Sequence, residues 1–97
     1  MEKEFLEKML VEFVSLNLSE YMQNNRVKVK STSRFFFIRV NNNSYKNLDP
    51  ECEKIIVLIR DFLNNQTIKF SLSYGRKREN GLLSEKEVDE IDIFCLY

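Results

Sequence analysis

The spacing of apolar residues changes between a helical and a strand repeat along this chain, and the order of those changes limits the possible fold more than any other feature. Residues 2–24 carry apolar side chains at three- and four-residue steps, which predicts a long amphipathic helix. Residues 26–31 and 34–41 alternate instead with a period of two, as strands do. Because only a short turn separates these two strands, we expect an antiparallel hairpin.

A second helix is predicted to begin at Asp49. Aspartate is a favoured N-cap, Pro50 suits the first helical position, and an apolar stripe continues the helical pattern to Leu63. Strand-like alternation then returns in residues 66–74, which we expect to form a third strand.

The end of the chain contains another apolar segment, residues 91–97, that is typical of a strand. The residues before it allow two interpretations. Ser84 and Glu87 match a capping box, which predicts a short helix at 85–90. Alternatively, the last strand extends back through Glu87.

Taken in order, the predicted elements are α-β-β-α-β-β. This order indicates an α+β fold, with a mainly antiparallel four-stranded sheet and two helices packed on one face. A length of 97 residues is typical of one domain, so we expect residues 1–97 to form a single compact α+β domain. An acidic last strand beside a basic strand would pair opposite charges, each pair contributing about 0.2–1 kcal/mol.

Missing and rare residue types argue against several functional classes. The chain has no histidine and only two glycines, whereas acid–base catalysis most often uses histidine and phosphate-binding loops need glycine. Cys52 and Cys95 are far apart in the sequence, and we expect reduced, buried thiols rather than a metal site. We therefore expect no enzyme, no cofactor and no metal. Apolar runs stay well below the length of a membrane span, about 20 residues, so we expect no membrane partner. The N-terminus is charged from the start, unlike a secretory signal, and residue types encoded by AT-rich codons are frequent. We therefore expect a location in the cytoplasm of a bacterial host.

The formal net charge is zero, but bases and acids are segregated along the chain. The candidate basic contacts to a partner or nucleic acid are Arg26, Lys28, Lys30, Arg39, Lys69, Arg76, Lys77 and Arg78. The candidate acidic contacts to a partner are Glu85, Glu87, Asp89, Glu90 and Asp92. Such segregation indicates electrostatic complementarity, either within the fold or with another molecule.

Each charged group has two interpretations. Alternation places Arg26, Lys28 and Lys30 together on one face of their strand. These hairpin bases would form a platform for single-stranded nucleic acid if Phe35 and Phe37 share the outer sheet face with them. Alternatively, both phenylalanines lie under the first helix. The bases at 76–78 either reach a phosphate or acidic groove, or form a solvated turn. The acids either imitate phosphates toward a partner or pair with the basic strands.

Part of the chain shows a recognisable combination of features. A leading helix is followed by a short basic strand at 26–31, the stretch Ile38–Asn42 and an acid-led helix at 49–63. In these features residues 20–64 resemble the small phage-encoded anti-CRISPR proteins that inhibit Cas nucleases. The resemblance implies a stoichiometric protein-binding inhibitor. Those inhibitors are strongly acidic throughout, whereas this chain is neutral overall and has its dense acids in residues 79–97.

Together these features favour a non-catalytic phage or mobile-element protein. We expect it to bind and inhibit a host nucleic-acid-handling complex, such as a CRISPR–Cas effector, with a host protein or ribonucleoprotein as partner. One alternative is a small nucleic-acid-binding protein that uses the basic hairpin face. Another is a dimeric adaptor or structural protein that pairs through the exposed edge of its last strand. A monomer and a homodimer are both compatible with the sequence.

Overall fold

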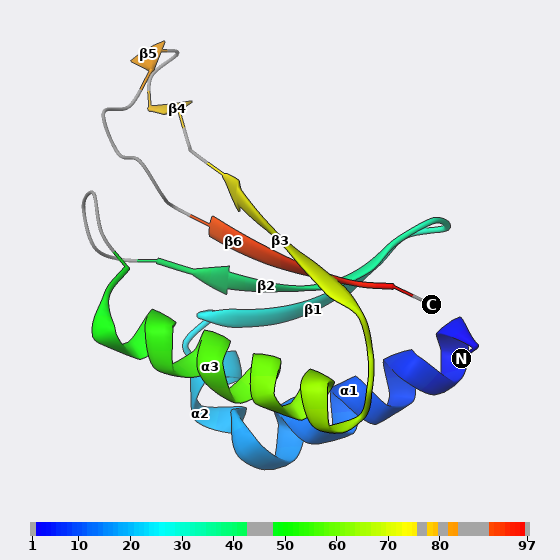
Figure 1. Cartoon of the computed structure of the whole chain (residues 1–97). Coiled ribbons are helices and arrows are strands. Elements are labelled where there is room, and N and C mark those ends of the chain that lie inside the picture. Colours follow the sequence, from blue (N-terminus) through cyan, green and yellow to red (C-terminus); the bar gives the residue numbers. More distant parts are fainter. Residues whose placement is uncertain (1, 43–47, 76–77, 80–81, 84–89, 97) are drawn as a thin grey trace.

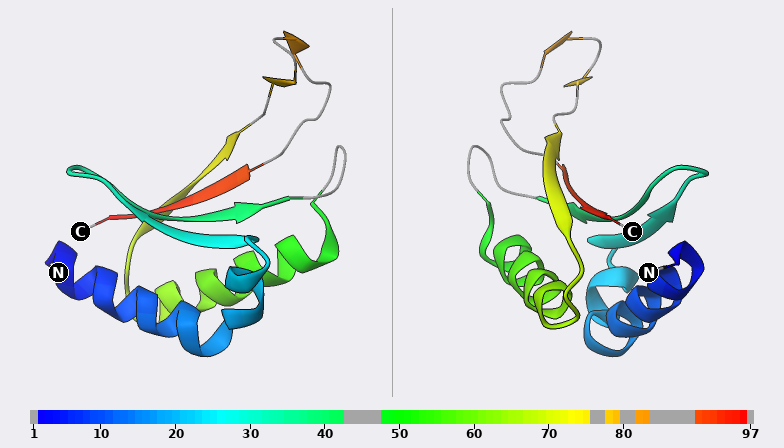
Figure 2. Two further views of the ribbon diagram at one scale, coloured as in Figure 1. Left: turned by 180° about the vertical axis from the view of Figure 1, so that it is seen from behind. Right: turned by 45° about the vertical axis from the view of Figure 1, so that its right-hand side comes forward.

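The structure, a computed structural model, has the α+β architecture that the sequence predicts (Figure 1). It describes residues 2–42, 48–75, 78–79, 82–83 and 90–96. A four-stranded antiparallel sheet forms one layer, and the helices form a second layer against one of its faces (Figure 2). In chain order the elements are α1 (Lys3–Asn17), α2 (Ser19–Gln23), β1 (Val27–Ser31), β2 (Phe36–Asn41), α3 (Pro50–Asn65), β3 (Phe70–Gly75), β4 (Arg78–Glu79), β5 (Leu82–Leu83) and β6 (Glu90–Cys95). We call the sheet face that lies away from the helices the outer face.

The strand order of the main sheet is β1-β2-β6-β3, with every neighbouring pair antiparallel. The last strand, β6, is therefore an interior strand, and the prediction that it offers an exposed edge to a partner is wrong. Its apolar alternation is compatible with an edge or an interior position, so only the long-range pairing decides between them. The edges of the sheet are β1 and β3, while β4 and β5 pair with each other in a small separate ladder.

The helix predicted at residues 2–24 is interrupted at Leu18. This residue has φ −129° and ψ 24°, outside the helical region, and its side chain is buried in the core. The interruption gives two helices, α1 and α2, in place of one. Asn25, with a φ of 60°, then redirects the chain into β1, a backbone conformation that asparagine tolerates better than most residues.

The start of α3 agrees with the sequence signals. The carboxylate of Asp49 accepts a hydrogen bond of 2.9 Å from a backbone N–H of the first turn, as an N-cap does. The helix continues to Asn65, and a turn that contains Thr67 at a φ of 58° follows it. Because this turn uses residues that the sequence assigns to the third strand, β3 begins at Phe70 rather than at residue 66.

The hydrophobic core lies between the inner face of the sheet and the helices. Its fully buried members include Leu6, Leu10, Val14, Phe36, Ile38, Val40, Ile55, Ile59, Leu63, Ile91 and Ile93. Phe13 and Phe62 stack with 4.1 Å between their ring centroids and join α1 to α3. Full burial of one such side chain contributes about 1.5–3 kcal/mol, so this set decides which face of the sheet the helices cover.

Candidate binding face of the sheet

The antiparallel register arranges the outer-face side chains in two rows across the sheet. Read from β1 to β3, the first row is Lys30, Phe37, Phe94 and Ser71. The second row is Lys28, Arg39, Asp92 and Ser73. Residues directly opposite one another in an antiparallel ladder point to the same face, so each row is a line of neighbouring side chains. We call these residues, together with Phe35, the outer-face cluster.

Aromatic rings occupy the middle of the outer-face cluster. The ring of Phe94 contacts that of Phe37 with 4.9 Å between centroids, and it meets Phe35 edge-to-face at 5.9 Å. Phe35 is 54% exposed, whereas Phe37 is only 9% exposed. The hypothesis that both phenylalanines lie under the first helix is therefore wrong. Phe37 is largely buried and packs against Phe94, whereas Phe35 offers its surface to solvent.

The aromatic rings form part of an open groove of about 740 Å³ on the outer face. The groove is lined by Arg34, Phe35, Phe37, Arg39, Ser71, Ser73, Asp92, Phe94, Cys95 and Leu96. Its composition is mixed, with an aromatic floor, two serine hydroxyls from the edge strand β3 and guanidinium groups from β2 and the turn before it. Such a groove offers stacking surfaces and hydrogen-bond donors to the same ligand.

Arg39 is held by two acids of the neighbouring strand. Its Nε and Nη2 atoms donate hydrogen bonds of 2.8 and 3.0 Å to the two oxygens of Asp92, and Nε lies 3.4 Å from an oxygen of Glu90. Its guanidinium carbon lies 5.5 Å from the centroid of the Phe37 ring. The hydrogen bond to Asp92 raises the pKa of Arg39 above its ordinary value, although partial burial acts in the opposite direction.

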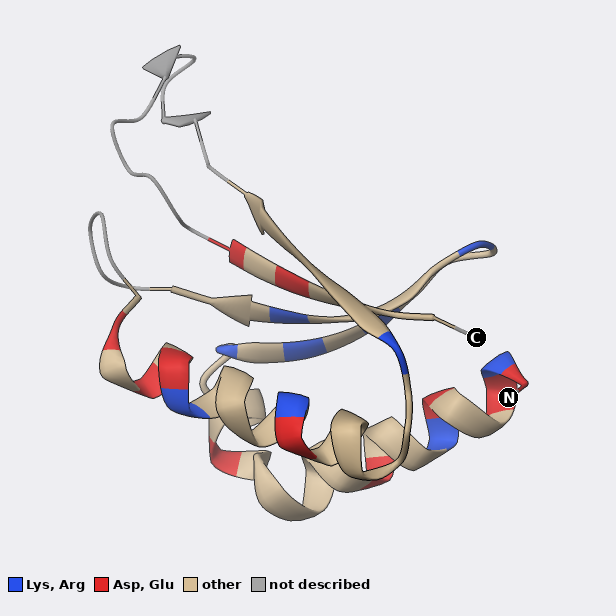
Figure 3. Cartoon of the chain, in the orientation of Figure 1, with Lys and Arg blue, Asp and Glu red and all other residues tan. Residues whose placement is uncertain are grey.

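The contacts of Arg39 show that two of the candidate acids pair within the fold rather than stand ready for a partner. Glu90 and Asp92 pair internally with a basic strand, and Figure 3 shows the acidic residues of β6 beside the basic residue of β2. The other candidate acids, Glu85, Glu87 and Asp89, lie outside the described residues. Of the helix predicted at 85–90 only the last residue, Glu90, is described, and it begins β6. The cross-strand pairing of opposite charges that the sequence predicts is thus present between β2 and β6.

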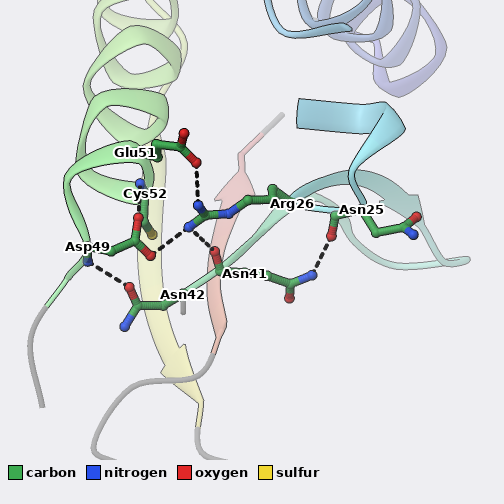
Figure 4. A network of polar contacts seen from close by, with 7 residues as sticks. All are labelled: Asn25, Arg26, Asn41, Asn42, Asp49, Glu51 and Cys52. Atoms are coloured by element: carbon green, nitrogen blue, oxygen red, sulfur yellow. Dashed lines mark hydrogen bonds and ion pairs between the residues drawn. The ribbon is translucent and has the colours of Figure 1, made fainter. Parts of the chain in front are cut away.

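Arg26 does not belong to the outer face, and the prediction that it shares that face with Lys28 and Lys30 is wrong. It precedes β1, and its side chain reaches the beginning of α3, as Figure 4 shows. Its Nη2 atom donates to Asp49 at 2.6 Å and to the backbone carbonyl of Asn41 at 3.1 Å, and Nη1 donates to Glu51 at 2.5 Å. The N-terminal acids of α3 attract the guanidinium, so Arg26 ties β1, β2 and α3 together.

The remaining candidate bases lie in different places. Lys28 is exposed and Lys30 is half-buried, both on the outer face. Lys69 is exposed just before β3, and its carbonyl accepts a hydrogen bond from the N–H of Leu96. Arg78 lies in β4, but its side chain is not among those that the structure describes. The bases at 76 and 77 are outside the described residues.

Sequence reasoning missed Phe94 and the serines Ser71 and Ser73 as members of the groove. The alternation in residues 91–97 already separates Phe94 from Ile91 and Ile93, which is the signal that could have placed it on the other face. Its position beside Phe37 follows only from the pairing of β6 with β2.

Among the described residues, no three acidic or cysteine side chains gather in a way that could hold a metal ion, and no helix of that part of the chain is long and apolar enough to cross a membrane. No family model, no curated protein and no solved structure matches the chain. The resemblance to anti-CRISPR proteins therefore stays a prediction from the sequence.

Proposed function

We propose that this protein is a non-catalytic binding domain that takes single-stranded nucleic acid on the outer face of its sheet. The observation that carries the proposal is the row in which Lys30, Phe37, Phe94 and Ser71 lie side by side across the open face. An aromatic platform flanked by basic side chains and hydroxyl groups is the arrangement that sheet proteins use to bind unpaired nucleotides.

The aromatic part of the cluster favours unpaired bases over duplex. A base must be unstacked from its neighbours before it can lie against a side-chain ring, and single strands meet this condition at little cost. Phe35 has more than half of its surface exposed, so it is the ring that can accept a base. The contacts of Phe94 with Phe35 and Phe37 hold the rings in place before binding, which lowers the entropy cost of association.

The charged part of the cluster suits a phosphate backbone. Lys28 and Lys30 lie at the β1 side of the two rows, and Ser71 and Ser73 lie at the β3 side. Asp92 lies between them, but the bidentate contact with Arg39 balances its charge. The positive charge of the two lysines is therefore available to phosphates while the serine hydroxyls can bond to base edges.

Inhibition of a host nucleic-acid-handling complex stays a separate prediction from the sequence. Glu90 and Asp92 lend it no support as contacts, since Arg39 holds both carboxylates. Capture of partners from a host lysate, with and without nuclease treatment, distinguishes the two functions. Material that disappears after nuclease treatment supports the proposed function, whereas a protein retained after it favours the inhibitor.

The direct test is fluorescence anisotropy with labelled single-stranded DNA and RNA of mixed sequence at low salt, with a duplex as the comparison. Phe35→Ala should weaken single-strand binding between about 5-fold and about 150-fold, because stacking of one base contributes about 1–3 kcal/mol. The matched control is Phe5→Ala, since Phe5 is 60% exposed and lies on α1, away from the outer face. The proposal is overturned if single strands do not bind, if duplex binds equally well, or if the two variants behave alike.

Salt dependence tests the role of the lysines. For single strands, each phosphate that a protein neutralises contributes about 0.7 to the slope of log affinity against log salt. The double variant K28A/K30A should therefore lower the slope by about 1.4, whereas Lys54→Ala on the exposed side of α3 should leave it unchanged. An unchanged slope in the double variant removes the two lysines from the binding site.

A further inference from the structure

We propose that two copies of this chain associate through the free edges of their β3 strands, joining the two four-stranded sheets into one continuous antiparallel sheet. The inference goes beyond the proposed function and does not depend on it. It rests on the backbone geometry and side-chain order of the edge strand β3. The edge of β3 that points away from β6 pairs with no strand in the described part of the chain (Figure 1).

The backbone groups that point out from this edge can be assigned residue by residue. The N–H of Leu96 donates to the carbonyl of Lys69 at 2.9 Å, and the register continues from Phe70 opposite Cys95. Residues whose N–H and C=O groups face a partner strand alternate with residues whose groups face away. Because Lys69 faces β6, the groups of Phe70, Leu72 and Tyr74 face the open edge.

This assignment restricts how two copies can pair. Only residues with outward groups can exchange hydrogen bonds, so the register with the most pairs has the two-fold axis beside Leu72. Leu72 then lies opposite Leu72 of the second copy, and Phe70 lies opposite its Tyr74. On the outer face, Ser71 lies opposite Ser73 of the second copy.

The side chains match in this register. The pairs are apolar with apolar, aromatic with aromatic and hydroxyl with hydroxyl, combinations that stabilise neighbouring strands. Leu72 is 38% exposed and Tyr74 is 56% exposed on the helix side of the sheet, so both have surface left to bury. The strand contains no charged residue from Phe70 to Gly75, and pairing therefore creates no like-charge contact.

The opposite edge strand, β1, is less suited to self-pairing than β3. On β1 the hydrogen bonds from Thr32 N–H to Phe35 and from Asn41 N–H to Arg26 show that Val29 points its backbone groups outward. Self-pairing around Val29 would place Lys28 opposite Lys30 of the second copy on both sides of the axis. Like charges directly opposite one another are destabilising, and lysines commonly protect edge strands in this way. The β1 edge has that protection and the β3 edge does not.

The geometry also gives the shape of the pair. Antiparallel neighbours are related by a two-fold axis perpendicular to the sheet, so both outer faces point in the same direction. The two grooves would lie on one continuous surface, with Ser71 and Ser73 of each copy at its centre.

The test is sedimentation equilibrium of the full chain over a wide concentration range. The wild-type chain should approach twice its monomer mass at high concentration. Leu72→Lys and Leu72→Glu should each remain monomeric, because two like charges then lie opposite one another at the two-fold axis. An equimolar mixture of the two variants should recover the dimer mass, because Lys then lies opposite Glu. The matched control is Leu16→Lys, since Leu16 is an exposed leucine of α1; this variant should dimerise as the wild type does.

Circular dichroism of each variant verifies that the fold is retained. A wild-type chain that stays monomeric throughout the range overturns the proposal. The same conclusion follows if L72K still dimerises, or if the mixture of L72K and L72E stays monomeric although both are folded.

Discussion

Removing the guanidinium of Arg26 should destabilise the fold rather than weaken a partner contact. The contact with Asp49 joins side chains that are 11% and 14% exposed, and a hydrogen bond to a charged group in such a place contributes about 1.5–3 kcal/mol. The contact with Glu51 contributes only about 0–1 kcal/mol because that carboxylate is 59% exposed. The buried Nε atom of Arg26 finds no hydrogen-bond partner among the described residues. Its burial costs about 1 kcal/mol, which offsets part of the stabilisation from the two carboxylates.

These contributions give a decrease of about 2 kcal/mol for Arg26→Met, which keeps the apolar stem of the side chain. In a domain of this length such a decrease lowers the melting temperature by about 8–16 °C. The measurement is urea unfolding followed by circular dichroism. Lys28→Met, two residues further along the same strand segment, is the matched control and should change the free energy of unfolding by less than about 0.5 kcal/mol.

A double-mutant cycle separates the ion pair from other effects of the substitution. Asp49→Asn keeps a good N-cap for α3 but removes the negative charge. The cycle of R26M with D49N should give a coupling energy of at least about 1 kcal/mol. If R26M is no more destabilising than K28M, or if the two substitutions are additive, Arg26 does not tie the strands to α3 and the assignment is refuted.

Two further predictions concern stability. Burial raises the pKa of Cys52 from 9.0 to about 11 and that of Cys95 from 9.0 to about 12, so both thiols stay neutral in the fold while unfolded thiols ionise first. The thiols should therefore leave the free energy of unfolding unchanged below pH 9. Above pH 9 they should lower it by about 1.4 kcal/mol per pH unit for each thiol. If the free energy of unfolding of a C52A/C95A chain falls equally steeply between pH 9 and 11, the thiols are not the cause. Thr67→Gly should raise stability by about 0.5–1 kcal/mol, because Thr67 has a φ of 58° and glycine has no Cβ to oppose it. Thr67→Ala keeps the Cβ, and thermal unfolding should show no comparable gain for it.

Local patterns predicted the helices and strands because their information lies in neighbouring residues. The three- and four-residue steps of α1 and α3 and the alternation of β1, β2 and β6 are all present in the structure. The interruption at Leu18 has no such signal, since serine and leucine around it are compatible with a continuous helix. The late start of β3 could not be predicted either. The turn before it needs a positive φ at Thr67, which threonine, a β-branched residue, rarely adopts.

The candidate site was predictable only in part. Alternation placed Lys28, Lys30 and Phe37 on one side of their strands, and the register confirms that they share a face. The same alternation assigned Arg26 to that face, but the acids of α3 drew its side chain away. A pattern of side-chain directions cannot include a competing charge that comes from a distant element.

By itself, then, the sequence determined the class of fold and the face on which most strand residues lie, because helical and strand periodicities depend on a few adjacent residues. Tertiary structure alone decided which strands became neighbours. It brought Asp92 to Arg39 across 53 positions of the chain, placed Phe94 against Phe37 and left β3 at an edge. Strand order depends on contacts between segments that are far apart in the chain, and no local repeat carries that information.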